Sequence, residues 1–349
     1  MDRERIEAFL DRFVRYASGA TTMGLLAVAD RSGLLAWLGE HMSGTSEEIA
    51  AGADLQERYV REILSGLAAA GALEYDGASR TFSLPAEHAL FLSDQDSPYF
   101  MGGWFDMLPA LFPQIDAVAE ATRIGGGVRF EEFEFGMIRG IDRGNGPSQR
   151  VFLTKRWLPA VPGLVERLET GIRVADVGCG TGTAAILTAE AFSNSRVIGF
   201  DVSEESLEVA RSRAGDVANV SFERRGAGEI PADPPFDLIT TFDVIHDLAD
   251  PLRGMTRIRE ALASDGVYLM MEPNASTELA NNLNDRAALL YGVSTLHCMT
   301  QSLAVGGEGL GAAWGRELAE DYAKRAGFST FQPLEEITNK FSAFYLLRP

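Results

Sequence analysis

The chain has 349 residues, of which 46% are hydrophobic, and its formal net charge is −19. This length and apolar content are sufficient for two domains. An acidic surface repels phosphate backbones and anionic lipids, so nucleic-acid and membrane partners are disfavoured. No apolar run approaches the roughly 20 residues that cross a bilayer, and the charged first residues do not resemble a signal sequence. We therefore expect a cytoplasmic protein.

The chain has two cysteines, Cys179 and Cys298, which lie far apart and outside any CxxC or Cys/His spacing. This arrangement suggests neither a disulfide framework nor a structural zinc site. We therefore expect no bound metal.

Residues 1–94 follow the order helix, helix, hairpin, which is typical of a winged-helix domain. Thr45 and the acids after it form a helix start, and a second helix is expected over 56–70. Asp76-Gly77 is a turn signal between two short extended runs. In DNA-binding relatives of this module the second helix enters the major groove. Residues 1–90, however, carry eight basic and fourteen acidic residues, which favours a role in dimerisation or in covering a substrate.

The first forty residues carry more apolar side chains at helical spacing than a three-helix module can bury alone. Among the residues that exceed this need are Met23, Leu25, Leu26, Trp37 and Leu38, which we expect to contribute to a surface that a second copy of the chain covers. We therefore expect a homodimer.

Residues 95–170 are rich in aromatic residues and methionine, and we expect them to form connecting helices. Trp104, Phe105 and Met107 are candidates for lining an apolar substrate pocket. Ordinary packing between domains is an equally good interpretation of the same residues.

From residue 171 onward, strands and helices alternate, as in a largely parallel sheet with helices on both faces. The expected strands are 173–177, 196–200, 220–223, 236–240, 267–271, 329–334 and 341–347. The third domain is thus predicted to span 171–349.

A glycine-rich loop, Gly178-Cys-Gly-Thr-Gly182, joins the first of these strands to an alanine-rich helix. A pyrophosphate-binding fingerprint requires its third glycine one position later, where Thr183 stands, which disfavours a nicotinamide-dependent oxidoreductase. The spacing fits a ligand without phosphates, and the carboxylate of Asp176 suits an ammonium group. Asp201, which ends the second strand, is placed to accept hydrogen bonds from ribose hydroxyls; capping the next helix is its alternative role.

The segments 174–182, 197–202 and 236–240 resemble the motifs of class I S-adenosylmethionine-dependent methyltransferases. The resemblance implies a Rossmann-like α/β fold with a seven-stranded sheet, order 3-2-1-4-5-7-6, and a last antiparallel strand. It implies S-adenosylmethionine as cofactor and S-adenosylhomocysteine as product. The binding residues implied are Asp176, Gly178, Cys179, Gly180, Gly182, Asp201, Val202 and Asp243. Where the family often has an acid that reads adenine, this chain has Gly226, so backbone groups of Gly226 and Ala227, or Glu229, are the candidates.

The segment 242–251 resembles the histidine-containing segment of small-molecule O-methyltransferases that also carry a winged-helix dimerisation domain. His246 is therefore the candidate catalytic base, with pocket closure as its alternative role. The insertion 295–311 resembles a bacterial group of winged-helix methyltransferases and suggests His297, Cys298 and Met299 as part of a lid or acceptor pocket. A small, partly apolar substrate methylated at oxygen is favoured. A winged-helix regulator that only binds the cofactor is the main alternative.

Overall fold

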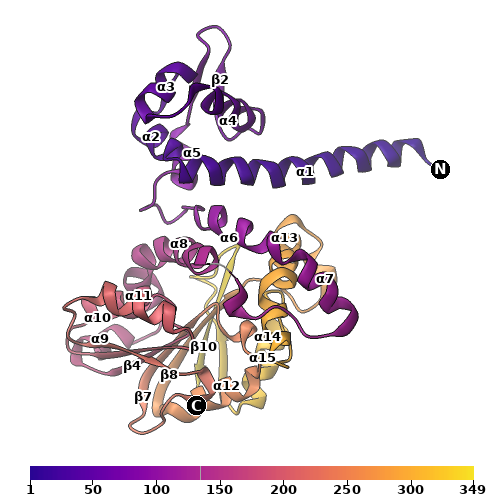
Figure 1. The fold of residues 1–349 in the computed structure, drawn as a ribbon. Coiled ribbons are helices and arrows are strands. Elements are labelled where there is room, and N and C mark those ends of the chain that lie inside the picture. The colour runs from indigo at the N-terminus through magenta and orange to yellow at the C-terminus, as the bar shows by residue number, and fades with distance from the viewer. Residues whose placement is uncertain (134) are drawn as a thin grey trace. The chain divides into compact units, whose positions relative to one another are not determined.

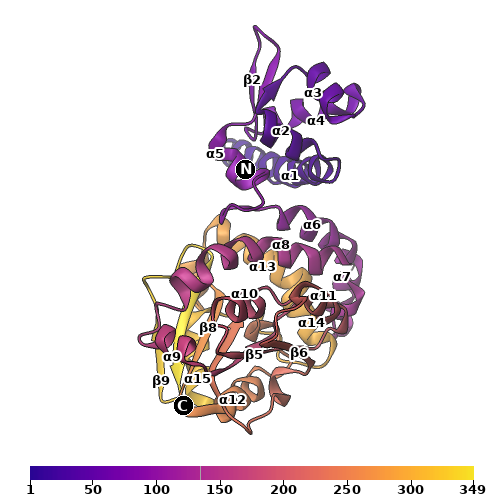
Figure 2. The ribbon, with the colours of Figure 1, turned by 90° about the vertical axis from the view of Figure 1, so that its left-hand side faces the viewer.

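The structure, a computed structural model, describes residues 1–133 and 135–349 (Figures 1 and 2). The chain divides into two compact units. The first comprises Met1–Ala110 and Phe135–Ser148, and the second comprises Leu111–Glu134 and Gln149–Pro349. Within the described ranges, no helix is long and apolar enough to cross a membrane.

The first unit begins with helices and a small sheet in winged-helix order, as the sequence predicts. Its helices are α1 (Arg3–Arg31), α2 (Leu34–His41), α3 (Ser46–Ala53), α4 (Glu57–Ala69), α5 (Ala86–Leu92) and α6 (Gly103–Leu111). Three short strands, β1 (Ser43–Gly44), β2 (Glu74–Asp76) and β3 (Thr81–Ser83), form a sheet of order β1-β3-β2. Thr45 and Glu48 form the expected capping box at the start of α3. Leucines of α2 and α4 are buried in the core between these elements.

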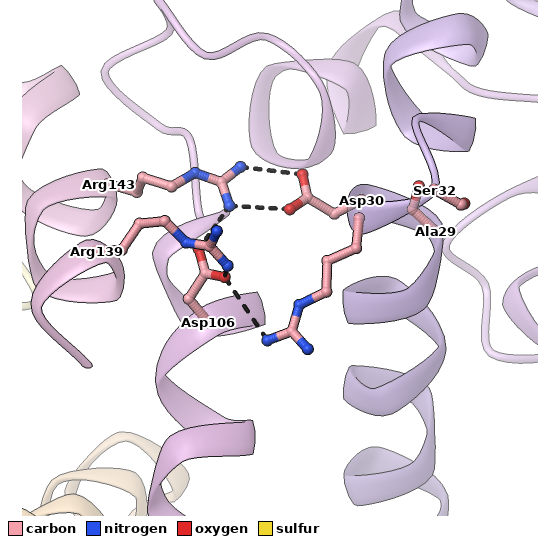
Figure 3. A network of polar contacts seen from close by, with 7 residues as sticks. Ala29, Asp30, Ser32, Asp106, Arg139 and Arg143 are labelled. Atoms are coloured by element: carbon pink, nitrogen blue, oxygen red, sulfur yellow. Dashed lines mark hydrogen bonds and ion pairs between the residues drawn. The ribbon is translucent and has the colours of Figure 1, made fainter. Parts of the chain in front are cut away.

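A buried ion-pair network joins α6, α1 and α8 (Phe135–Phe152) in this unit (Figure 3). Asp106 of α6 is fully buried and accepts a hydrogen bond of 2.7 Å from Arg143 and another bond from Arg139. Arg143 also donates two hydrogen bonds, of 2.9 and 3.0 Å, to Asp30 near the end of α1. The charge of Asp106 is tolerated inside the protein because both arginines satisfy it.

The second unit is built on a seven-stranded sheet of order β6-β5-β4-β7-β8-β10-β9. Six strands run in the same direction, and β10 alone among the strands of this sheet is antiparallel to its neighbours β8 and β9. The order is the 3-2-1-4-5-7-6 arrangement of the sequence prediction, which is thereby confirmed. The strands are β4 (Arg173–Val177), β5 (Arg196–Asp201), β6 (Val220–Arg224), β7 (Phe236–Phe242), β8 (Leu262–Pro273), β9 (Thr330–Pro333) and β10 (Ser342–Arg348).

Helices cover both faces of this sheet because successive strand residues point to opposite sides. Val174 packs with α9 (Leu164–Thr170) and α10 (Thr183–Ala191), whereas Ala175 packs with α12 (Pro251–Ala261) and α15 (Gly315–Arg325). The remaining helices of the unit are α7 (Ile115–Ile124), α11 (Glu204–Ala214), α13 (Asp285–Val293) and α14 (Met299–Ala304). The expected Asp250 cap and Pro251 start of α12 are both present.

Candidate active site

The glycine loop leaves the carboxyl end of β4 in a conformation that requires its glycines. Gly178, Gly180 and Gly182 have φ angles of +71°, +52° and +82°, in the left-handed region that favours glycine. A Cβ atom on Gly178 would lie 2.5 Å from a methyl carbon of Val244, and one on Gly182 would lie 2.8 Å from Ala210 Cβ. Backbone groups therefore form the surface of this loop, where a ligand can approach them closely.

Asp201 ends the neighbouring parallel strand β5, so its carboxylate lies at the same edge of the sheet as the glycine loop. Its Oδ2 accepts a hydrogen bond of 2.8 Å from the Gly180 N–H, and its Oδ1 accepts one of 2.9 Å from the Ser203 N–H. The cap of α11 is Ser203, whose hydroxyl accepts from the Ser206 N–H. Burial raises the pKa of Asp201, although the N–H groups of Ser203 and Gly180 act to lower it.

Residues predicted to contact the rest of the cofactor lie next to Asp201. Val202 is 60% exposed, so its side chain is available to a ligand. A Cβ on Gly226 would lie 3.7 Å from Val202 Cγ1, which places these two residues side by side. The side chain of Ala227 is buried in the core, so only its backbone is available to a ligand.

Asp176 lies beneath the glycine loop, with 2% of its surface exposed. Burial raises its pKa to about 7, partly offset by the hydroxyl of Thr240, which donates to Oδ1 at 2.8 Å. Cys179 lies in the loop itself, and burial raises the pKa of its thiol.

The raised pKa of Asp176 predicts a specific dependence of stability on pH. Between about pH 4 and 7 the folded protein retains a proton that the unfolded chain has lost, so ionisation of Asp176 lowers stability as pH rises. The full effect is on the order of 4 kcal/mol. Asp176→Asn cannot ionise and is expected to be more stable relative to wild type at pH 8 than at pH 5. Denaturant unfolding at both pH values measures the difference in free energy of unfolding between the variant and wild type. The same difference at pH 5 and pH 8 would contradict the prediction.

A second group of residues lies at the ends of β7 and β8, at the same edge of the sheet. Asp243 directly follows β7 with a φ of +58°, a strained conformation for a residue with a side chain. His246, three residues further, is 3% exposed, and its Nδ1 lies 2.6 Å from Glu272 Oε2. Burial lowers the pKa of His246, but the charges of Asp247 and Glu272 outweigh it, and the pKa is well above its usual value.

Glu272, near the end of β8, holds this segment in place. Its Oε1 accepts hydrogen bonds from the backbone N–H of Ile245 at 2.8 Å and of Val244 at 3.3 Å. Its Oε2 accepts a third bond of 3.1 Å from Trp314 Nε1, besides its contact with His246. Sequence reasoning missed Glu272 and Trp314. An acid at the end of the fifth strand, in Met271-Glu272-Pro273, was the signal that could have identified Glu272.

The Nε2 side of His246 faces residues of the predicted lid. His246, Asp247 and Cys298 each offer one metal-ligand atom, and these atoms lie within 4.8 Å of one another. His297 is 3% exposed and lies against the rings of Phe133 and Phe130, with centroids 4.7 and 6.0 Å away. The structure thus brings His297 and Cys298 beside His246, with Met299 half-buried at the start of α14.

The other predicted pocket residues belong to the first unit. Trp104, Phe105 and Met107 lie on α6, and Phe105 is buried in the core of that unit. Their role in a substrate pocket remains a prediction.

A parallel sheet with a glycine turn after its first strand, an acid at the end of its second and an antiparallel last strand defines a Rossmann-like, methyltransferase-type domain. Comparison with protein families agrees. Residues 168–322 match a family described as a methyltransferase domain, and residues 19–94 match the Rv2258c-like winged HTH domain. The chain therefore combines a winged helix-turn-helix domain with a methyltransferase domain.

Curated relatives match only part of this chain. The uncharacterized 37.1 kDa protein in transposon TN4556 of Streptomyces fradiae is 36% identical over 30% of this chain and 31% of its own length. A demethylmenaquinone methyltransferase of Staphylococcus aureus (strain MRSA252) is 30% identical over 31% of this chain and 45% of its own length. The chain thus spans less than half the length of these relatives.

Solved structures resemble the whole chain in fold. The mitomycin 7-O-methyltransferase MmcR has a TM-score of 0.70 and 17% identity, covering 100% of both chains. Human N-acetylserotonin methyltransferase, solved in complex with SAM, has a TM-score of 0.67 and 19% identity, covering 100% of this chain and 98% of its own.

Proposed function

We propose that this protein transfers a methyl group from S-adenosylmethionine to a small, partly apolar molecule, most readily at oxygen. The observation that carries the proposal is that the glycine loop, Asp201 and the His246–Glu272 pair lie at one edge of the sheet in a methyltransferase domain. Ligands of open α/β sheets bind at the carboxyl ends of the strands. The full-length likeness to O-methyltransferases supports the same acceptor chemistry.

In this proposal the glycine loop and Asp176 hold the amino-acid part of the cofactor, and Asp201 accepts hydrogen bonds from the ribose hydroxyls. Val202, with the backbone of Gly226 and Ala227, contacts the adenine. S-adenosylmethionine, when bound there, would supply an electrophilic methyl group for in-line transfer to the acceptor oxygen and would leave as S-adenosylhomocysteine, a neutral thioether.

His246, in its neutral form, is proposed as the group that takes the acceptor's proton. Because its pKa lies well above the usual value, the share of that form and the rate of transfer are expected to rise with pH. Its Nδ1 lies against Glu272, which leaves Nε2 as the atom that faces the acceptor. The carboxylates of Glu272 and Asp247 stabilise the imidazolium that forms, as the acid of a catalytic triad does. Asp243 lies beside the cofactor, and His297 and Met299 line the acceptor pocket.

The test uses labelled S-adenosylmethionine with a panel of phenols, carboxylic acids and amines. Removal of a general base costs about 100-fold or more in rate, so His246→Gln is expected to lose methyl transfer to this extent. Binding of S-adenosylhomocysteine should be unchanged. His41→Gln, on an exposed position of α2, is the control and should keep full activity. Unchanged turnover in His246→Gln would remove the base role alone; wild type without transfer or cofactor binding would overturn the function.

We further propose that the protein is a homodimer in which α1 packs against a second copy. Ile6, Phe9, Leu10, Phe13 and Val14 form an apolar stripe on α1, and each is more than half exposed. A helix with such a stripe requires a partner to bury it. Light scattering should give about twice the chain mass of 37.8 kDa. A mass equal to one chain would contradict the dimer.

Nucleic acid is not among the proposed partners. The exposed arginines of α4, the helix that would enter a groove, are paired with acids of the same helix, Arg58 with Glu62 and Arg61 with Glu57. Both cysteines are free thiols, which is consistent with the proposed location in the cytoplasm.

A further inference from the structure

We propose that this protein binds a divalent ion of the zinc class through His246 Nε2, the carboxylate of Asp247 and Cys298 Sγ. The inference is about metal binding and goes beyond the methyl transfer proposed above; only the acceptor class named below rests on that proposed function.

The three ligand atoms have the spacing that a small metal ion requires. Zinc binds nitrogen and oxygen at about 2.0–2.2 Å and sulfur at about 2.3 Å, so ligand atoms in a tetrahedral site lie roughly 3.3–3.7 Å apart. Nε2 of His246 and Oδ1 of Asp247 are separated by 3.3 Å, and one ligand atom from each of His246, Asp247 and Cys298 lies within 4.8 Å of the other two.

The burial of unpartnered polar atoms also points to a missing ligand. Oδ1 of Asp247 is buried and makes no hydrogen bond with any residue that the structure describes, although Nε2 lies at ion-pair distance. The neighbouring His297 has both ring nitrogens buried and likewise without a hydrogen bond among the described residues. The ion pair with His246 Nε2 leaves this buried oxygen of Asp247 without a hydrogen bond from any described residue, and a bound cation would satisfy it more fully.

The chemistry of the donor set favours zinc over magnesium or calcium. Imidazole and thiolate are ligands of zinc and of later transition metals, whereas magnesium and calcium prefer oxygen. A thiolate and a carboxylate also neutralise a doubly charged ion inside the protein. With His246 these are three protein ligands, the number that a catalytic zinc site uses while its fourth position stays open.

Glu272 supplies the outer contact that such sites require. A histidine that binds a metal through one ring nitrogen usually donates from the other nitrogen to a carboxylate, which fixes the ring orientation. Nδ1 of His246 lies 2.6 Å from Glu272 Oε2, and Trp314 Nε1 holds the same oxygen at 3.1 Å. The second and third ligands of this arrangement come from segments about fifty residues apart, which is why cysteine spacing predicted no metal site.

An ion in this position would bind the acceptor as an anion at the open coordination site. A thiol or an acidic hydroxyl is the acceptor class that fits, because coordination lowers the pKa of such groups. One nitrogen atom cannot bind an ion and take a proton together. His246 is therefore a ligand in the metal-loaded protein and the proton acceptor only in the metal-free protein.

The test uses cobalt(II), which occupies zinc sites and gives a near-ultraviolet absorption band when a thiolate binds it. Metal-free wild type is expected to develop this band on titration with cobalt(II) and to lose it on addition of zinc. Cys298→Ser should abolish the band and weaken zinc binding at least tenfold by calorimetry. Cys179→Ser, the matched change at the other cysteine, should keep both properties.

No band in wild type, or an unchanged band in Cys298→Ser, would overturn the metal site. Thermal melting of each variant shows whether it is folded. If Cys298→Ser does not fold, the cobalt(II) titration of the wild type still tests the metal site. None of these readouts depends on methyl transfer, so failure of the metal site leaves the proposed function intact. Failure of the proposed function likewise leaves the metal titration interpretable.

Discussion

Asp201→Asn is expected to weaken binding of S-adenosylhomocysteine by about 1,000-fold. A carboxylate that accepts hydrogen bonds from both ribose hydroxyls contributes two charge-assisted bonds, each worth about 1.5–3 kcal/mol, and an amide replaces neither fully. The loss of about 4 kcal/mol corresponds to this factor in the dissociation constant. Titration calorimetry of the variant and wild type with the same nucleoside measures it directly.

The substitution is chosen because it changes the charge of residue 201 while largely keeping its shape. The remaining oxygen of asparagine can still accept a backbone N–H from Gly180 or Ser203, so the variant retains one of the two backbone hydrogen bonds that residue 201 makes with the glycine loop and the start of α11. A melting temperature close to wild type would show that the loop is folded. Asp216→Asn, at an exposed position, is the control and should bind normally. Equal affinity of Asp201→Asn and wild type would remove Asp201 from the cofactor site.

Five strands of the second unit, β4, β5, β7, β8 and β10, could be predicted because they are largely buried and therefore stand out as apolar runs. β4 has the predicted boundaries, and β5 extends one residue beyond them to Asp201. β8 begins at Leu262, five residues earlier than predicted. The early part of that strand contains Ser264, Asp265 and Gly266, which are poor strand formers and fall in the register shift between the pairs Phe236–Leu262 and Leu238–Val267.

The candidate site was predictable where it depends on local backbone form and not where it depends on contacts between distant segments. The glycine loop and Asp201 are found from one strand and the turn that follows it. Glu272, Trp314 and Cys298 reach His246 from three separate parts of the chain, and no local pattern links them. The sheet order explains the contact of Glu272, because it places the ends of β7 and β8 side by side. Trp314 and Cys298 come from helical segments that follow β8 in the chain.

Glu272→Ala is expected to destabilise the second unit by at least about 4 kcal/mol. The carboxylate is 1% exposed and satisfies the N–H groups of Val244 and Ile245, the indole of Trp314 and the ring of His246. Alanine leaves these buried donors without an acceptor, at a cost of about 1–3 kcal/mol each. A loss of this size lowers the melting temperature of a unit this large by roughly 10 °C, which calorimetry can measure.

Two further variants separate the role of Glu272 as a shared acceptor from the effect of removing any acid. Trp314→Phe removes one donor and leaves the carboxylate bonded to Val244, Ile245 and His246, so it should cost less than Glu272→Ala. Glu335→Ala breaks an exposed ion pair with Arg316 and should change stability by no more than about 0.5 kcal/mol. If Glu272→Ala and Glu335→Ala had the same melting temperature, the hydrogen bonds of Glu272 would not stabilise the segment that carries His246. The position of His246 at the sheet edge would then have to come from the turn at Asp243 alone.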